Sequence, residues 1–220
     1  KGERASDASR RVCEGRRVGT RFTKTRRIRA EGGAMGRREQ IIACTRELYE
    51  EKGLAKTSVQ DIADRVGVTR SLFYHYFTDK DAVTSAVLDS YIEDFLGMLK
   101  AWNDDRVEGD VDGALDTLVP VLRRALFDRG SFRHTVDENA ALYIDFINRV
   151  ADQAARYIVT TTVQDYERLH EVRIEHVYES FYVLIIGVVG YLRSHPDASD
   201  AIVKDIIAQS LHLDRGRLRA

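Results

Sequence analysis

The segment from Thr69 to Phe77 holds side chains that could bind a nucleic acid. It reads Thr-Arg-Ser-Leu-Phe-Tyr-His-Tyr-Phe. At 100° per residue, three aromatic residues share one side of a helix and are expected in the core: Phe73, Tyr76 and Phe77. The other side carries polar, aromatic and cationic groups: Arg70, Ser71, Tyr74 and His75. An arginine on such a side can donate two hydrogen bonds to O6 and N7 of a guanine, which distinguishes that base by about 1 to 3 kcal/mol.

A longer helix is expected upstream of this segment, over residues 37–52. Its apolar stripe has the spacing i, i+3, i+4 and i+7 of an amphipathic helix and consists of Ile41, Cys44, Thr45 and Leu48. Gly53 follows as the residue that ends the helix.

A second, short helix and a tight turn are expected between these two segments. Thr57 precedes Ser58-Val59-Gln60-Asp61, which has the N-cap and the acidic and amide first turn of a helix start. Apolar residues continue at helical spacing to Val66, which gives a helix of about two turns. Gly67 suits the left-handed conformation that closes a helix, and Thr69 is the next N-cap. Two short helices joined in this way form a helix-turn-helix.

The rest of the chain is also predicted to be helical. Asp79 opens a long helix that keeps apolar spacing to about Trp102 and should join the small domain to the remainder. After a loop at 103–112, helical patterns cover 115–126, 142–158, 173–193 and 202–211. The 173–193 pattern is apolar almost all round, so we expect it to be buried on two sides. No strand alternation appears. We therefore expect an all-α fold, with a three-helix helix-turn-helix domain at 37–85 and a larger helical domain at 86–220.

The charged residues are unevenly distributed along the chain. It holds 34 Lys and Arg and 35 Asp and Glu, but residues 1–36 hold 11 basic and only four acidic residues. This segment is predicted to be a flexible basic arm. Two interpretations of it stay open: contact with DNA phosphates or a minor groove, or no selected role upstream of Met35. Residues 37–85 hold eight basic and eight acidic side chains, which excludes tight DNA binding by general electrostatics.

Other classes of function have no supporting motif. The chain has no GxSxG, HExxH or GxGxxG sequence, so neither enzymatic activity nor a cofactor is expected. Cys13 and Cys44 form neither a disulfide framework nor a zinc set, which favours a reducing, cytoplasmic setting. His170 and His176 project to different faces of a helix, so we expect each to be solvated or hydrogen-bonded and predict no metal site. The longest apolar run, Val183–Leu192, is too short to span a bilayer, and no membrane partner is expected.

Residues 37–87 closely resemble the DNA-binding domain of the TetR family of bacterial one-component repressors. The matching stretches are Leu-Tyr-Glu-Glu-Lys-Gly at 48–53, Thr-Ser-Val-Gln-Asp-Ile-Ala at 57–63, Gly-Val-Thr-Arg-Ser at 67–71, and Phe-Tyr-His-Tyr-Phe at 73–77 followed by Lys80. The combination is specific, although it covers only a small part of the chain. The resemblance implies a second, all-helical domain that binds a small molecule and dimerises through its last two helices.

The resemblance also implies roles for particular residues. The pair at the start of the second helix would meet a phosphate, the start of the recognition helix would reach base edges, and a lysine at the start of the fourth helix would grip phosphate. Leu72 departs from the small or hydroxylated residue often found at its place, and its natural partner would be a thymine methyl. The DNA-binding residues expected on this basis are Thr57, Ser58, Thr69, Arg70, Ser71, Leu72, Tyr74, His75 and Lys80.

Two more sets of residues are expected in the larger domain. Polar and aromatic side chains among apolar neighbours could line an effector pocket: His134, Asn139, Tyr143, Asn148, Arg149, Tyr157 and Tyr182. The apolar residues of the last two helices would form the dimer interface: Phe181, Ile185, Val188, Val189, Leu192, Ile202, Ile206 and Leu211.

These features together predict a ligand-responsive transcriptional regulator. The expected mechanism is that of a repressor which binds a palindromic operator in double-stranded DNA as a homodimer and is released by a small, largely apolar effector. The alternative is a helix-turn-helix regulator or helical adaptor with no small-molecule ligand.

Overall fold

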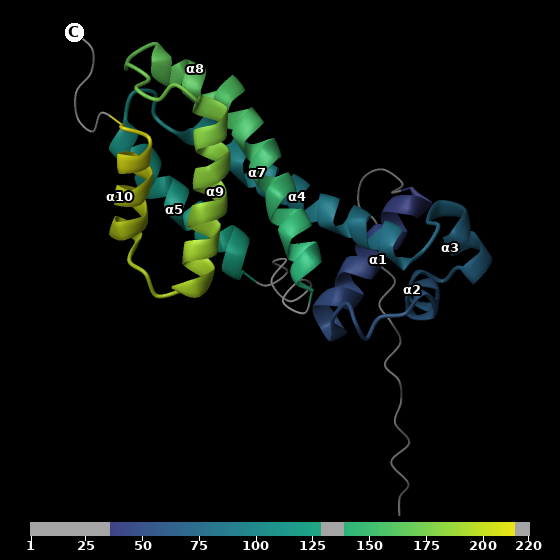
Figure 1. Ribbon diagram of the computed structural model, residues 1–220. Helices are drawn as coiled ribbons and strands as arrows, with labels where there is room; N and C mark the ends of the chain where they lie inside the picture. The colour runs from purple at the N-terminus through teal and green to yellow at the C-terminus, as the bar shows by residue number, and fades with distance from the viewer. Residues whose placement is uncertain (1–35, 129–138, 214–220) are drawn as a thin grey trace, which may run out of the picture. The chain divides into compact units, whose positions relative to one another are not determined.

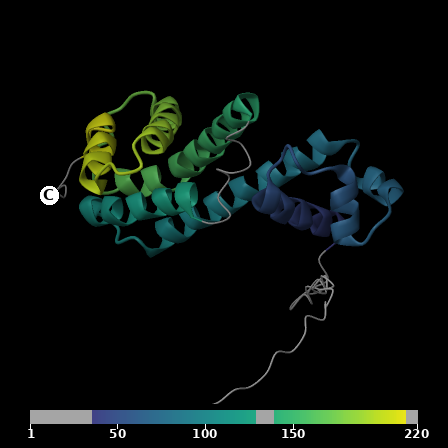
Figure 2. The ribbon, with the colours of Figure 1, turned by 90° about the horizontal axis from the view of Figure 1, so that it is seen from below.

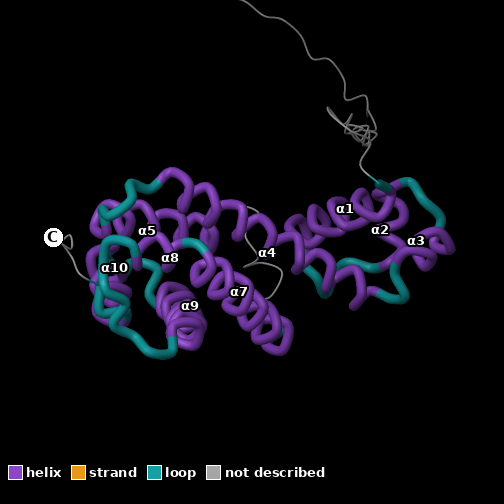
Figure 3. The backbone as a smooth tube through the Cα atoms, turned by 90° about the horizontal axis from the view of Figure 1, so that it is seen from above, coloured by secondary structure: helices purple, strands orange, loops and turns teal. Residues whose placement is uncertain are grey.

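The computed structural model describes residues 36–128 and 139–213. Every regular element in these two ranges is a helix, as Figure 3 shows, and the predicted all-α fold is confirmed for them. The predicted basic arm up to Met35 and the candidate pocket residue His134 lie outside the described residues.

The first group of helices lies together in Figure 1. It packs around a small aromatic and aliphatic core. Its helices are α1 (Arg37–Lys52), α2 (Val59–Val66) and α3 (Arg70–Tyr76), closed by the first turns of α4 (Lys80–Asp105). The core residues come from all four helices and the turn after α3: Ile41, Leu48, Ile62, Phe73, Phe77, Val83 and Ala86. The predicted bounds 37–52, the end at Gly53 and the short second helix are confirmed.

Two details of this core differ from the sequence-based expectation. Tyr76, the last residue of α3, was expected inside, but 37% of its surface is exposed. Cys44 is only half-buried, and Tyr49, one residue after Leu48, is fully buried instead. The apolar side of α1 is therefore centred nearer to Tyr49 than the i, i+3, i+4, i+7 pattern indicated.

The second group of helices forms a larger body. It contains α5 (Val111–Phe127), α7 (Ala140–Thr160), α8 (Thr162–Glu167), α9 (Val177–Ser194) and α10 (Asp200–Ser210). α7 packs along α9, and α5 packs on α4, α9 and α10. One core cluster joins Leu115 and Val119 of α5 to Val188 and Leu192 of α9 and to α10.

Helix α4 belongs to both groups, as its course in Figure 2 shows. Its first turns pack on α1, and its last turns contact α5, where Trp102 Nε1 donates hydrogen bonds to the Ala114 carbonyl and to Thr117 Oγ1, each 3.1 Å long. The predicted start at Asp79 is confirmed, since its carboxylate accepts from the N–H of Ala82 as the N-cap. The helix continues to Asp105, one turn beyond the predicted end.

Helix α9 begins later than predicted, at Val177 instead of Arg173. By length and composition alone it would also pass for a membrane-spanning helix, with a mean hydropathy of 1.2 over 18 residues. Here it packs against α5, α7 and α10, and its buried residues are Val188, Val189 and Leu192. The short helix α8 was not predicted from the sequence.

Candidate nucleic-acid interface

The turn between α2 and α3 fixes the start of the candidate recognition helix. Gly67 has φ of +77° and ψ of 40°, the left-handed conformation that a glycine adopts without strain. The N–H groups of Gly67 and Val68 both bond to the Ala63 carbonyl, at 3.0 and 2.9 Å, which closes α2. Thr69 then caps α3, because its hydroxyl accepts from the N–H of Leu72 at 3.2 Å. The helix-turn-helix predicted from these residue types is confirmed.

Helix α3 is held by two aromatic side chains and leaves the rest of its surface to solvent. Phe73 and Phe77 are buried, with ring centroids 5.8 Å apart. The exposed residues are Arg70, Ser71, Leu72, Tyr74, His75 and Tyr76. Three of these are large and at least partly apolar, and none is acidic, although the surrounding domain is rich in carboxylates. This combination of cationic, hydroxyl and aromatic groups suits an anionic partner.

Arg70 and Tyr74 form a pair on the exposed side of α3. The guanidinium carbon lies 6.0 Å from the centroid of the tyrosine ring, and a guanidinium nitrogen lies 3.4 Å from the tyrosine hydroxyl. Both side chains stay solvent-exposed. The pair holds the guanidinium along the helix while leaving most of its five N–H donors available.

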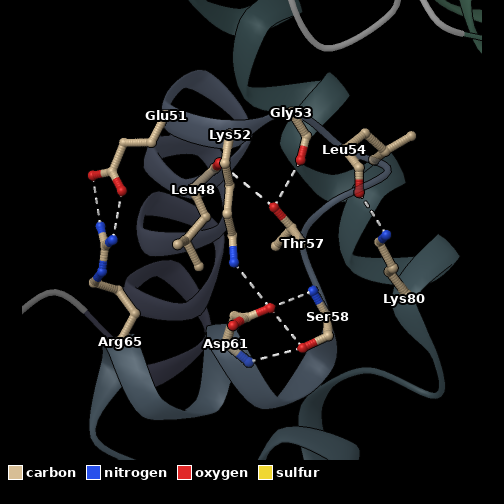
Figure 4. A network of polar contacts seen from close by, with 10 residues as sticks. All are labelled: Leu48, Glu51, Lys52, Gly53, Leu54, Thr57, Ser58, Asp61, Arg65 and Lys80. Atoms are coloured by element: carbon tan, nitrogen blue, oxygen red, sulfur yellow. Dashed lines mark hydrogen bonds and ion pairs between the residues drawn. The ribbon is translucent and has the colours of Figure 1, made fainter.

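The start of α2 is closed by a reciprocal cap, shown in Figure 4. Ser58 Oγ accepts from the N–H of Asp61 at 3.2 Å, and Asp61 Oδ2 accepts from the N–H of Ser58 at 2.8 Å. The Ser58 hydroxyl also donates to Asp61, and Lys52 Nζ lies 3.0 Å from the same carboxylate. These contacts, led by the Ser58 hydroxyl, hold the pKa of Asp61 well below its usual range. Ser58 is exposed, so its position is compatible with a phosphate contact.

Thr57 and Lys80 lie beside this cap, but their polar groups are directed into the protein (Figure 4). Thr57 is 2% exposed and its hydroxyl donates to the Gly53 carbonyl at 2.8 Å. Lys80 Nζ donates to the Leu54 carbonyl at 2.6 Å, which uses one of its three N–H donors. Ser58 and Tyr74, in contrast, are exposed.

Three other cations of this domain, Arg46, Lys52 and Arg65, are paired with carboxylates. Arg65 binds Glu51 through two hydrogen bonds of 2.9 and 2.6 Å, and Arg46 binds Asp94 at 2.5 Å. These pairs explain how a domain with balanced charge can still present one cationic surface. The paired carboxylates bind arginines that lie outside α3, so they do not neutralise Arg70.

The predicted effector residues do not come together in one place. Asn148, Arg149 and Tyr182 line a shallow groove between α7 and α9, where the Tyr182 hydroxyl donates to Asn148 at 3.2 Å. Asn139 caps α7, and Tyr143 lies under the Arg193 guanidinium at 4.0 Å. Tyr157 lies nearer the other end of α7, with Lys100 Nζ 6.0 Å from its ring. None of these six residues lines the cavity of about 130 Å³ that the structure contains between α4, α5, α8 and α10.

The predicted dimer residues divide into buried and exposed sets. Four of them are buried within the chain itself: Val188, Val189, Leu192 and Leu211. Phe181 and Ile185 are half-buried, and Ile202 and Ile206 are exposed. Val183, which was not in the predicted set, is 67% exposed on α9. A helix that is apolar all round does not reveal from its sequence which side faces its own core, and this is why the two sets were not separated.

Two further predictions concern histidine and metal chemistry. His170 was expected to be solvated or hydrogen-bonded, but it is 3% exposed and neither ring nitrogen has a partner among the described residues. Within residues 36–128 and 139–213, no three His, Cys, Asp or Glu side chains are placed to hold a metal ion.

The sequence similarity to known proteins is concentrated in the first group of helices. The model of the family described as bacterial regulatory proteins, tetR family, matches residues 41–87. The repressor KstR2 of Rhodococcus jostii is 34% identical over 65 residues, which are 30% of this chain and 32% of that protein. The regulator YvdT of Bacillus subtilis is 34% identical over 86 residues, which are 38% of this chain and 42% of that protein. The matched segment thus spans less than half of either relative.

The similarity of fold extends further than the similarity of sequence. The crystal structure of AlkX, a TetR family repressor from a Dietzia strain, aligns with a TM-score of 0.59 at 17% identity and covers 82% of this chain and 98% of that one. At this identity the alignment speaks for the fold of the larger helical body, while residues 41–87 carry the family pattern. Residues 41–87 thus match the bacterial regulatory proteins of the tetR family, and the larger helical body shares its fold with a solved structure of that family.

Proposed function

We propose that this protein is a DNA-binding transcriptional regulator that acts as a repressor. The observation that carries the proposal is α3, a helix anchored by Phe73 and Phe77 whose remaining side chains are exposed and include no carboxylate. Its seven residues can enter a major groove, where Arg70 would read a guanine and Leu72 a thymine methyl. The related proteins KstR2 and AlkX are named as repressors, which supports repression over activation.

Contacts with the DNA backbone would come from the two ends of α2 and α3. The first N–H groups of a helix have no partner inside it and favour an anion. Ser58 at the start of α2, and Thr69 and Tyr74 of the recognition helix, would bind phosphates on either side of the groove, and Lys80 would use its remaining donors. Thr57 takes a positioning role in this proposal, because its hydroxyl is bonded to the Gly53 carbonyl.

The protein would bind its operator as a homodimer. One helix-turn-helix with balanced charge binds weakly, and joining two of them raises the overall affinity by about 10² to 10⁴ without any new contact. The exposed apolar residues Val183 of α9 and Ile202 and Ile206 of α10 support a partner surface on these two helices. A two-fold dimer predicts two half-sites of opposite direction, that is, a palindrome.

A small apolar effector would weaken DNA binding through α4. This helix contributes Val83 and Ala86 to the core beneath α3 and Leu99 to the wall of the cavity in the larger body. A ligand that binds better when the two α3 helices are wrongly spaced lowers DNA affinity by that difference in binding free energy.

Selection of bound fragments from random duplex DNA tests the proposal. The expected result is a palindromic sequence, bound by the purified protein in a salt-dependent manner. Recovery of no preferred sequence, with binding that depends on salt alone, would contradict it. A preferred sequence without a two-fold repeat would support sequence-specific DNA binding but contradict the proposed dimer.

A further inference from the structure

The larger helical body contains a cavity of about 130 Å³ at the end of the body formed by the last turns of α4 and α10. The start of α5, helix α8 and the segment from α8 into α9 complete its walls, which are almost entirely apolar. An engineered protein cavity of about 150 Å³ with apolar walls stays dry and binds benzene. The cavity in this chain is therefore of the size that holds a single aromatic ring.

One polar side chain in this cavity has no partner. His170 lies in the loop after α8, is 3% exposed and lines the cavity, and neither of its ring nitrogens makes a hydrogen bond within the described part of the chain. Its ring stacks on Tyr166 with centroids 4.5 Å apart and planes 20° from parallel, so its orientation is fixed by packing. Buried polar groups in proteins are nearly always bonded, and an exception calls for a specific explanation.

Several other polar groups around the cavity are already engaged. The Arg106 guanidinium binds Asp165 at 2.6 Å and Asn103 at 3.1 Å. Trp102 Nε1 donates to the Ala114 carbonyl, and the Asp110 carboxylate accepts from the N–H of Gly113 as the cap of α5. Because the charge of Arg106 is neutralised by Asp165, the cavity does not favour an anionic ligand. The His170 ring therefore calls for one neutral ligand group that can donate or accept a hydrogen bond.

We propose that this cavity is the effector site and that it takes a small apolar molecule of about one ring, whose single hydroxyl group hydrogen-bonds to His170. A hydroxyl can donate and accept, as can the two nitrogens of an imidazole, so the match holds for either tautomer. The proposal rests on the ligand response of the proposed function and gives that response a site and a class of ligand. The site differs from the predicted pocket, because none of the six predicted pocket residues that the structure describes lines it.

The position of the cavity also supplies a route to the DNA-binding helices. Leu99 and Trp102 on the last two turns of α4, and Arg106 as its C-cap, line the cavity. A molecule that fills the cavity must press on or reshape this end of α4, and the first turns of the same helix form part of the core beneath α3.

Binding of phenol and toluene to the full chain, measured by calorimetry without DNA, tests the site. The two probes share a ring and differ by a hydroxyl in place of a methyl group. The wild type should bind phenol about tenfold or more tighter than toluene, the factor that one hydrogen bond to an otherwise unpaired buried group provides. His170→Leu should lose this preference and bind the two probes alike. His195→Leu, a matched change of an exposed histidine at the far end of α9, should keep it.

A second variant keeps the test decisive if His170→Leu fails to fold. Leu118→Phe adds a ring at the cavity wall and should abolish binding of both probes while the helical circular dichroism is retained. A wild type that binds neither probe, or that binds them equally, overturns the proposal, as does a preference for phenol that survives in His170→Leu.

The DNA-binding assay separates this proposal from the proposed function. Phenol should weaken binding of the selected palindrome by wild type and not by His170→Leu. If phenol binds in a His170-dependent manner and DNA affinity does not change, the ligand site stands and the proposed ligand response fails. If no DNA is bound at all, the DNA-binding function fails, and the calorimetric result still decides the site.

Discussion

The hydroxyl of Tyr49 lies 2.7 Å from Oγ1 of Thr84, fully buried where α1 packs on α4. Thr84 donates its own proton to the Lys80 carbonyl at 2.7 Å, so the tyrosine must be the donor in this pair. Burial raises the pKa of Tyr49 to about 12, because an anion there would lose its hydration. This contact couples the DNA-binding helices to the helix that leads into the larger body.

Tyr49→Phe should lower the free energy of unfolding by about 0.5 to 1.5 kcal/mol near pH 8, the usual net contribution of one buried hydrogen bond. The sign reverses at high pH. A folded-state pKa above the unfolded value of about 10 means that the unfolded chain releases the proton first, so the stability of the wild type falls as pH rises from about 10 to 12. The variant lacks this loss and should become the more stable of the two near pH 11. Urea denaturation of both proteins between pH 8 and 11.5 measures the crossing.

Tyr76→Phe is the control for this pH dependence, because Tyr76 is exposed on α3. Its stability difference from wild type should stay near zero over the same range. A constant difference between Tyr49→Phe and wild type at every pH would show that Tyr49 does not titrate as its burial requires.

Replacing Arg70 should change sequence preference more than overall affinity. Arg70→Ala should relax discrimination at one base pair of each half-site by about 1 to 3 kcal/mol, since a bidentate arginine recognises guanine in the major groove. Arg70→Lys should relax it nearly as far, because lysine keeps the charge but lacks the planar pair of donors. Fluorescence anisotropy with the selected duplex and its single-base variants measures both. Equal losses at every base pair would assign Arg70 to the DNA backbone instead.

Lys80→Ala should act on all DNA sequences alike. One phosphate contact fewer per subunit reduces the slope of log K against log salt by about 0.9 for each lost contact. The Leu54 carbonyl also loses the donor 2.6 Å away, so the free energy of unfolding should fall by about 1 kcal/mol. Lys100→Ala, which removes an exposed lysine further along α4, should leave both the salt slope and the DNA affinity unchanged. A change in the preferred sequence in Lys80→Ala would contradict the assignment.

The helix-turn-helix could be predicted from sequence because each of its boundaries is set by a local rule. Gly67 needs a left-handed conformation, Thr69 and Asp79 are N-caps, and each acts within a few residues of chain. The direction of side chains at the edge of a helix depends on tertiary packing, and the prediction was wrong at Tyr76 for this reason. The inward bond of Thr57 has the same origin, since its acceptor lies in the loop after α1.

The cavity could not be predicted from the sequence, because its walls come from three stretches that are far apart along the chain: 99–118, 158–181 and 207–213. Polar residues within apolar helices were a poor guide, since Asn148, Arg149 and Tyr182 bond to one another or to nearby carboxylates at the surface of the body. His170 carried no local signal. Its significance lies in two unpaired nitrogens, and that is a property of the folded chain alone.

The exposed apolar side chains of α9 and α10 lead to a prediction about assembly. Ile202→Glu places a carboxylate where 48% of an isoleucine is exposed on α10, so it should not disturb the core of the chain. If Ile202 lies in the dimer interface, a buried and unpaired carboxylate destabilises the dimer strongly. Sedimentation analysis should then show a monomer at concentrations where the wild type is a dimer, and affinity for a full palindrome should fall by about 10² or more while affinity for a half-site is kept.

Ile144→Glu is the matched control, because Ile144 is an isoleucine of α7 that is 57% exposed and lies on neither of the last two helices. It should remain a dimer with full operator affinity. The assignment of the interface to α9 and α10 fails if Ile202→Glu stays dimeric, and it fails equally if Ile144→Glu dissociates in its place. A monomeric Ile202→Glu that still binds the full palindrome as tightly as wild type would show that the two half-sites are read without the dimer, because avidity requires that the two reading helices be joined.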